Sequence, residues 1–154
     1  MNDKSTSKGP DILKLDQFWP YQVTVLADRI ARRTSTIVKQ YGLNLSQWRV
    51  LAAIAEQPGR TAVEVVTMTP MDKGIVSRAT RSMLEKGLVE RVASQSDGRV
   101  SHLHLTLDGD RLYQVLFPQI KAVLQMGNDV LSRERLTQLN HDLSELMEAL
   151  PDLR

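Results

Sequence analysis

The densest group of basic side chains lies between residues 73 and 86, KGIVSRATRSMLEK, where four basic residues and one acidic residue give a local charge of +3. Val76, Ala79 and Met83 recur at helical spacing, which predicts a helix with one apolar side. Arg78 and Arg81 lie off that side, where guanidinium groups can contact the phosphates and base edges of a DNA major groove. The pattern favours a nucleic-acid-binding helix; the alternative is a solvated basic face on an ordinary core helix.

A second basic site is expected at the tip of a β-hairpin, where Arg99 follows Asp97-Gly98. An arginine on a protruding turn can enter the narrow, electronegative minor groove of DNA. We expect the Asp97 carboxylate to orient the Arg99 side chain by a charge-assisted hydrogen bond rather than to bind DNA, because its charge repels phosphate. The alternative is that the two residues simply pair across an Asx-turn.

Residues for metal, redox or covalent chemistry are sparse. The chain contains no cysteine, which excludes disulfides, thiolate metal ligands and regulation by thiol oxidation. His102 and His104 share one face of a predicted strand and only His141 remains, so we expect solvent-exposed histidines and predict no metal or cofactor. We find no nucleophile elbow, phosphate loop or plausible triad, and therefore expect that the protein is not an enzyme.

Two short capped helices are expected to hold the basic face in place. Thr61 and Glu64 have the spacing of a capping box, which predicts a helix over 62–68. Asp72 is expected to cap the basic helix, and Gly87 to stop it. The turn between the two helices contains a proline, as suits a helix-turn-helix joint.

Further elements are predicted on either side. The period of apolar residues changes from about 3.6 to 2 after the basic helix, which indicates two strands of a hairpin. The additional elements are a helix from Asp16 to the stop signal Gly42, a helix capped by Ser46 and ended by Pro58-Gly59, strands within 88–94 and 99–107, a helix from about Gly109 to Leu131, and a last helix that carries five leucines.

These elements predict a mainly α fold with a small β-hairpin wing. The winged helix-turn-helix lobe is expected over 43–108, flanked by dimerisation helices over 12–42 and 109–154. At 154 residues the chain can bury one core, and we expect one domain over 12–154 after a disordered tail over 1–11. The net charge of +2 decides nothing about partners. No apolar run is long enough to span a bilayer, so we expect a soluble, cytoplasmic protein without membrane contact.

The leucines of the last helix indicate a homodimer. They are separated by three and four residues alternately, which is the spacing of a coiled-coil seam that needs a helical partner. Left uncovered, they would form an aggregation-prone patch. The alternative is pairing with the first helix of the same chain. The five residues are Leu136, Leu139, Leu143, Leu146 and Leu150.

The chain resembles the MarR family of winged-helix regulators in four ordered segments between residues 43 and 118: LNLSQWRVLAAIAEQPG, MDKGIVSRATRSMLEKGLVER, SDGR and LTLDG. The resemblance implies a homodimer that places two recognition helices in successive major grooves of double-stranded DNA and its wings in the flanking minor grooves. The DNA contacts that it implies are Thr61, Ala62, Lys73, Gly74, Ser77, Arg78, Arg81, Ser82, Asp97 and Arg99. Wings of this family often carry two adjacent arginines, whereas Gly98 replaces the first here.

The resemblance also implies regulation by a ligand. The segment WPYQVTVLADRIAR is similar to a subgroup that regulates the catabolism of hydroxycinnamates, some of whose members answer to aromatic acyl-CoA thioesters. A pseudo-palindromic operator and release by a small aromatic carboxylate or its thioester are therefore expected. The candidate ligand residues are Trp19, Tyr21, Arg29, Trp48 and Arg49. The alternative is that the aromatic members belong to the core or to a dimer interface.

The same sequence pattern is compatible with a second function. A winged-helix lobe can bind another protein instead of DNA, and a recognition helix without a basic face would favour that function. The basic face over 73–86 favours DNA.

Overall fold

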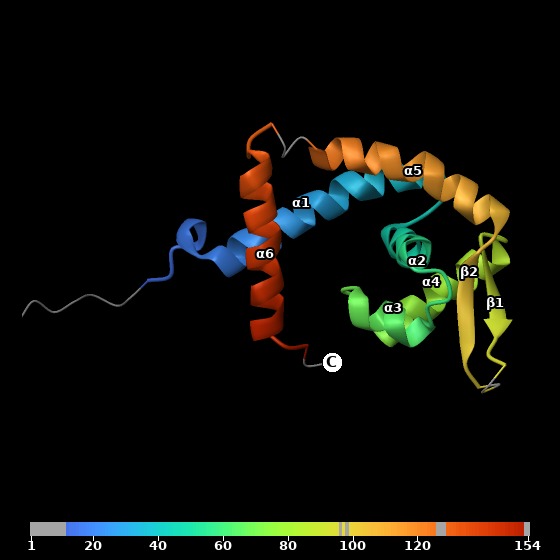
Figure 1. Cartoon of the computed structure of the whole chain (residues 1–154). Helices are drawn as coiled ribbons and strands as arrows, with labels where there is room; N and C mark the ends of the chain where they lie inside the picture. Colours follow the sequence, from blue (N-terminus) through green and yellow to red (C-terminus); the bar gives the residue numbers. More distant parts are fainter. Residues whose placement is uncertain (1–11, 96, 98, 126–128, 153–154) are drawn as a thin grey trace, which may run out of the picture.

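The computed structural model of the chain describes residues 12–95, 97, 99–125 and 129–152 (Figure 1). The fold is mainly α-helical with one two-stranded hairpin, as predicted. The predicted tail over 1–11 lies outside the described residues. In chain order the elements are the 3-10 turn η1 (Leu15–Gln17), α1 (Trp19–Lys39), α2 (Leu45–Glu56), α3 (Ala62–Met68), α4 (Lys73–Glu85), β1 (Val89–Ala93), β2 (Ser101–Leu105), α5 (Leu107–Gln125) and α6 (Arg133–Ala149).

The first helix begins later than predicted. A 3-10 turn occupies 15–17, Phe18 is extended, and α1 starts at Trp19 with Pro20 in its first turn. Proline has no amide hydrogen and its ring clashes with the carbonyl four residues earlier, so it fits the first turn of a helix but not its interior. The prediction of one helix from Asp16 was therefore wrong.

The cap of α2 also differs from the prediction, because Asn44 and not Ser46 is the N-cap. The Asn44 side chain accepts a hydrogen bond from the Gln47 amide at 2.9 Å, and the Gln47 side chain accepts one from the Asn44 amide at 2.9 Å. Both candidates are good capping residues, but only Asn44 has a glutamine three residues later to complete the reciprocal pair.

Helix α5 was predicted to reach Leu131 and instead ends at Gln125. Residues 129 and 130 form a turn, and 126–128 lie outside the described residues. The sequence there contains Gly127-Asn128, a combination that favours helix ends and turns.

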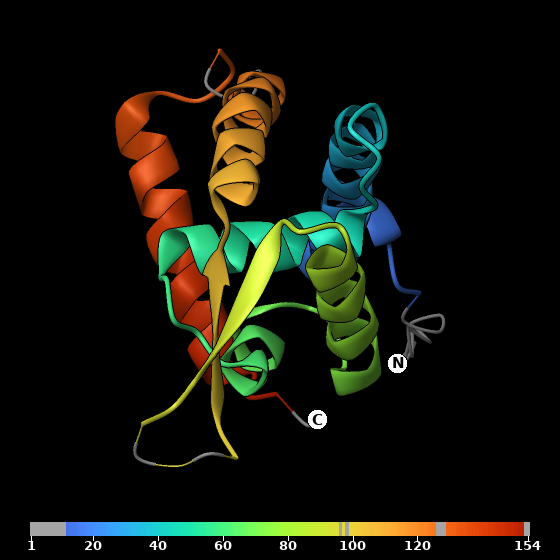
Figure 2. The same ribbon diagram turned by 90° about the vertical axis from the view of Figure 1, so that its right-hand side faces the viewer.

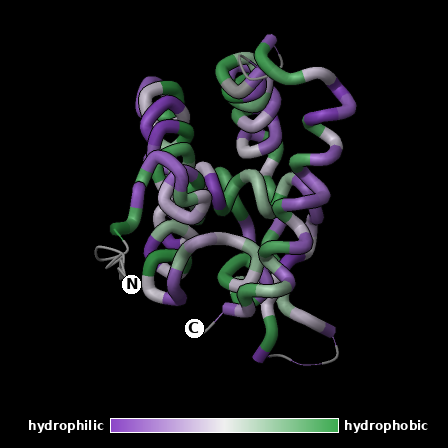
Figure 3. The backbone as a smooth tube through the Cα atoms, turned by 90° about the vertical axis from the view of Figure 1, so that its left-hand side faces the viewer, coloured by the Kyte–Doolittle hydropathy of each residue, from purple (hydrophilic) through white to green (hydrophobic). Residues whose placement is uncertain are grey.

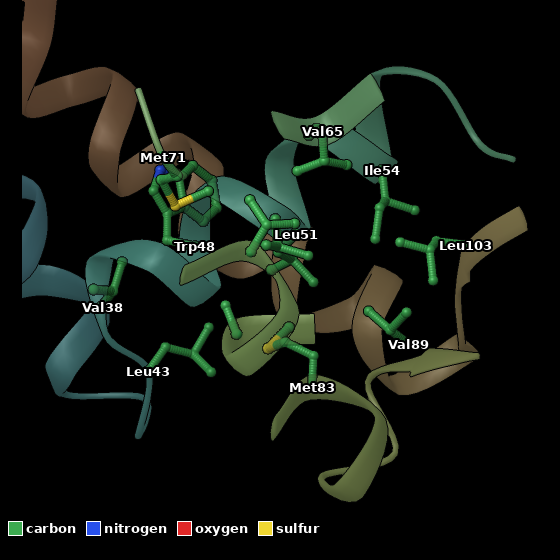
Figure 4. Close-up of a cluster of buried hydrophobic side chains, with 14 of the residues drawn as sticks. Val38, Leu43, Trp48, Leu51, Ile54, Val65, Met71, Met83, Val89 and Leu103 are labelled. Atoms are coloured by element: carbon green, nitrogen blue, oxygen red, sulfur yellow. The ribbon is translucent and has the colours of Figure 1, made fainter. Parts of the chain in front are cut away.

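The core joins the helix-turn-helix to the hairpin. Helix α2 packs against α4, β2, α1 and α5, and side chains from all of these elements meet around it (Figure 4). The hairpin is antiparallel, with Val89 opposite Leu105 and Ala93 opposite Ser101. The large side chains that are buried completely or nearly so include Leu51, Ile54, Met71, Met83, Leu103 and Leu116.

Helix α6 stands apart from this core. Figure 1 draws it across α1, but Figure 2 shows the two helices on opposite sides of the molecule, with α5 between them. None of its residues is buried, although hydrophobic and hydrophilic residues alternate along it (Figure 3). The leucine side of α6 is therefore not fully buried by any other part of the chain that the structure describes.

Candidate nucleic-acid interface

Side-chain caps fix both helices of the helix-turn-helix. Thr61 Oγ1 accepts a hydrogen bond from the Glu64 amide at 3.3 Å, and Glu64 Oε2 accepts one from the Thr61 amide at 2.7 Å, so the predicted capping box is confirmed. These backbone and hydroxyl donors hold the pKa of Glu64 below its usual range. At α4, Asp72 Oδ1 accepts from the Ile75 amide at 2.7 Å, as predicted.

Helix α4 has a buried side and an exposed basic side. Val76, Ala79 and Met83 are buried, and the helix packs against α2, α3 and β1. Of the predicted DNA contacts on α4, Ser82 is half-buried and five are exposed. The exposed residues are Lys73, Gly74, Ser77, Arg78 and Arg81. This face offers positive charge and hydrogen-bond donors together, which matches the phosphates and acceptor-rich edges of DNA.

Gly74 keeps space open at the start of this face. A Cβ atom at position 74 would lie 3.2 Å from Asp72 Oδ1 and 3.4 Å from Arg78 Nη1. The first distance is shorter than an ordinary van der Waals contact and the second is at its lower limit. The Asp72 carboxylate and the Arg78 guanidinium therefore lie close to the space that a side chain at position 74 would occupy. The glycine lowers helix propensity but lets the Asp72 carboxylate and the Arg78 guanidinium both lie close to the first turn.

The start of α3 contributes the other two predicted contacts on the helix-turn-helix. Thr61 and Ala62 are half-buried at the N-terminus of α3. Free amides and the positive end of a helix favour phosphate at such a position. The structure places them at the start of the helix that packs directly on α4.

The wing tip corrects one expectation. Asp97 accepts a hydrogen bond from the Arg99 backbone amide at 3.0 Å, which is the pairing of an Asx-turn, whereas we had expected a bond to the guanidinium. The Arg99 side chain is exposed, and no carboxylate of the described residues is paired with it. Gly98, the other residue of the predicted tip, lies outside the described residues.

The root of the wing is a close joint between its first and last residues. The Thr106 amide donates to the Leu88 carbonyl at 3.1 Å, and the Thr106 hydroxyl donates to the Gly87 carbonyl at 2.6 Å. The same hydroxyl oxygen accepts from the Gly109 amide at 3.1 Å. The segments EKGLVER and LTLDG thus meet in space, and the joint sets the direction in which the hairpin leaves the lobe.

The α2–α3 turn adds a further connection to the wing, which sequence reasoning missed. The Gly59 amide donates to the Leu103 carbonyl and the Leu103 amide donates to the Arg60 carbonyl, each at 2.9 Å. His102 Nδ1 lies 2.7 Å from the Gly59 carbonyl oxygen. His102 and His104 are half-buried, so the expectation of solvent-exposed histidines was wrong. Their strand face packs on this turn instead of facing water.

A shallow groove separates α3 and α4 from β1. It has a volume of about 270 Å³ and is lined mostly by apolar groups, and Lys73 and Arg91 are among its lining residues. Thr80 at its wall is fully buried, and its hydroxyl has no hydrogen-bond partner among the described residues. Arg91 was not among the predicted site residues. The alternation of β1 would not have revealed it, because Arg91 lies two residues after the buried Val89, on the same strand face, and is nevertheless exposed.

The five candidate ligand residues do not share one cavity. Tyr21 and Arg29 line a groove of about 430 Å³ along η1 and α1, to which the other three do not contribute. Trp19 is exposed at the start of α1. Trp48 is only 9% exposed, and burial lowers the pKa of Arg49.

Two aromatic residues of α5 form a row of stacked rings with Trp48. They were not among the predicted ligand residues. The Trp48 and Tyr113 rings are stacked with centroids 5.8 Å apart, and Tyr113 stacks on Phe117 at 5.5 Å. Phe117 is exposed, so the row of rings runs from the core to the surface. Offset stacking of this kind favours a flat aromatic partner.

None of the seam leucines of α6 is fully buried among the described residues. Leu136, Leu143 and Leu146 are half-buried, and Leu139 and Leu150 are exposed. Extensive pairing with α1 of the same chain, the alternative considered above, is absent from the contacts between the described elements. No group of described residues could hold a metal ion, and no described helix is long and apolar enough to cross a membrane.

The geometry of these elements agrees with comparisons to known proteins. Residues 41–100, from the end of α1 to the wing, match the family model described as MarR family. The homoprotocatechuate degradative operon repressor of Escherichia coli is 30% identical over 115 residues, an alignment that covers 72% of this chain and 75% of that protein. The chain belongs to the MarR family. As a member of this family it is a transcriptional regulator and not an enzyme.

Solved MarR-family structures share the whole fold. CouR from Rhodococcus jostii RHA1, solved bound to p-coumaroyl-CoA, has a TM-score of 0.80 at 19% identity and covers 93% of this chain and 99% of its own. A cysteine-to-serine mutant of MarR from E. coli, solved in complex with operator DNA, has a TM-score of 0.75 at 19% identity and covers 89% and 99%. At these identities the likeness shows the winged-helix fold.

Proposed function

We propose that this MarR-family regulator is a homodimeric repressor that binds a pseudo-palindromic DNA site. Helix α4 enters the major groove and the wing reaches the minor groove. The observation that carries the proposal is the exposed face of α4, where Arg78 and Arg81 point away from the core formed by Val76 and Met83. The exposed Arg99 at the wing supplies the minor-groove contact.

Two uncovered apolar surfaces support the homodimer. Helix α6 has no buried residue, and α1 exposes large apolar side chains, among them Trp19, Tyr21 and Leu26. A two-fold dimer would bury both surfaces and place two copies of α4 about one turn of DNA apart. Paired half-sites follow from that symmetry. A regulator of this kind acts on DNA in the cytoplasm.

A small aromatic acid or its CoA thioester is the proposed effector. One named relative represses a homoprotocatechuate degradative operon, and one structural neighbour was solved with p-coumaroyl-CoA. In this chain, the row of rings formed by Trp48, Tyr113 and Phe117 offers stacking for an aromatic ring. Arg49, half-buried and without a carboxylate partner among the described residues, offers a cation for the acid or the thioester phosphates.

DNA binding is tested by fluorescence anisotropy with the DNA upstream of the protein's own gene. Arg78→Ala is expected to weaken binding by about 1–3 kcal/mol and to relax specificity at one base pair. The matched control is Arg111→Ala, which removes an exposed arginine paired with Asp108 on α5 and is expected to leave affinity within about twofold. Equal affinity of the wild type and Arg78→Ala across a salt series would refute the proposed contact.

Effector binding is tested by adding aromatic carboxylates and their CoA thioesters to the preformed complex. Release of DNA by one of them, together with a change in the fluorescence of Trp48 in a Trp19→Phe variant, supports the ligand site at the aromatic row. No release by any compound at millimolar concentration would leave a repressor without this regulation.

A further inference from the structure

Gln47 joins the N-terminal cap of α2 to the DNA-facing helix α4. The residue is only 7% exposed. Its Oε1 accepts a hydrogen bond from the Asn44 amide at 2.9 Å, and its Nε2 donates to Ser82 Oγ at 2.7 Å. Both ends of the buried side-chain amide are thus engaged, and they link positions 35 residues apart.

The direction of the Gln47–Ser82 hydrogen bond follows from the chemistry of its neighbours. A backbone N–H can only donate, so the atom of Gln47 that faces Asn44 must be the oxygen. The atom that faces Ser82 is then the NH₂ group, which can only donate, and Ser82 Oγ must accept. The hydroxyl hydrogen of Ser82 is left for another acceptor, and no hydrogen bond within the described residues uses it.

Ser82 lies where an acceptor from outside can reach it. It lines an open groove of about 400 Å³ between the start of α2 and the exposed face of α4. Arg78, one turn earlier on α4, lines the same groove. The guanidinium and the positive end of α2 both favour an electron-rich group here.

We propose that Gln47 is a positioning residue that holds the Ser82 hydroxyl as a hydrogen-bond donor toward DNA. This inference rests on the proposed function, because it needs α4 to face DNA. The acceptor is an electron-rich atom of the duplex, either a phosphate oxygen or a base-edge acceptor in the major groove. Gln47 itself does not touch DNA.

The direct test reverses the hydrogen bond. In Gln47→Glu the carboxylate still accepts from the Asn44 amide and keeps the cap, since glutamate is as good a partner in a capping box. It cannot donate to Ser82, so the hydroxyl turns to donate to Glu and is lost to DNA. We expect Gln47→Glu and Ser82→Ala each to weaken DNA binding about tenfold, with melting temperatures close to the wild type.

The added negative charge needs its own control, which Asn44→Asp provides. This variant places a carboxylate at the same cap, still accepts from the Gln47 amide and leaves the Gln47–Ser82 bond unchanged. We expect it to weaken binding no more than about threefold. In a Ser82→Ala background, Gln47→Glu should weaken binding no more than Asn44→Asp does, because the hydroxyl is already gone.

Operator variants distinguish the two acceptors. If Ser82→Ala flattens the preference at one base pair, the acceptor is a base edge; if it weakens all sequences equally, the acceptor is a phosphate. The inference is overturned if Ser82→Ala binds within about twofold of the wild type, or if Gln47→Glu and Ser82→Ala are additive. When Arg78→Ala weakens binding in the same experiment, only this inference fails and the proposed function stands.

Discussion

Gly109 lies where α5 leaves the wing, and its substitution by alanine tests how the wing is held. A Cβ atom at this position would lie 1.9 Å from the Leu88 carbonyl oxygen. Carbon and oxygen in close contact are about 3.3 Å apart. Gly109→Ala must therefore move Leu88 and the start of α5 apart by roughly 1.4 Å, and both groups are backbone that cannot rotate away.

That displacement breaks the joint at the root of the wing. The two hydrogen bonds that Thr106 makes with Gly87 and Leu88 cross this joint, and they contribute about 1 kcal/mol each, or about 2 kcal/mol together. Alanine regains up to about 1 kcal/mol through its higher helix propensity. We expect Gly109→Ala to destabilise the protein by about 1–2 kcal/mol.

The assay is urea unfolding followed by circular dichroism at a fixed protein concentration, because the stability of a dimer depends on concentration. Gly42→Ala is the matched control. Gly42 has φ 71°, and a Cβ atom there meets nothing within 4 Å, so only the strain of the left-handed backbone, about 1 kcal/mol, is expected. The reasoning is refuted if Gly109→Ala is as stable as the wild type or more stable than Gly42→Ala.

Three further predictions concern single positions. Thr80→Val should raise the free energy of unfolding by about 1 kcal/mol, because it removes a buried hydroxyl without a partner among the described residues; a lower unfolding midpoint in urea would contradict this. Donors at Thr61 lower the pKa of Glu64 in the folded state, so its contribution to stability is present above the unfolded-state pKa and is lost as pH falls through the folded-state pKa. The Glu64→Gln variant should not show this loss of stability. If the free energy of unfolding fell equally with pH in the wild type and in Glu64→Gln, the prediction would be wrong. Leu143→Glu should convert a dimer into a monomer in sedimentation at micromolar concentration, whereas Ser144→Glu, off the leucine seam, should remain dimeric.

Features that depend on neighbours in the chain were predicted well. The Thr61–Glu64 capping box and the Asp72 cap involve groups three residues apart, and they formed as expected. The hairpin strands lie within the predicted ranges. The cap of α2 was missed although it is equally local, because Asn44 and Ser46 both have capping side chains and only the position of Gln47 decides between them.

Among the predicted DNA contacts, some positions also follow from local sequence and others depend on tertiary contacts. The helical period alone puts Arg78 and Arg81 opposite the buried Val76 and Met83. It does not reveal that Ser82 accepts a hydrogen bond from α2. The partners in that bond are far apart in the sequence, and their meeting depends on how the two helices cross.

Local patterns were enough to predict the helix-turn-helix, its basic face and a hairpin, because caps, helical period and strand alternation act over a few residues. The direction of the hairpin could not be predicted in this way. That direction comes from the backbone contact of Gly109 with Leu88 and from the pairing of Gly59 with Leu103. Both contacts join segments that are distant along the chain, so they exist only when the core has brought the helices and the wing together.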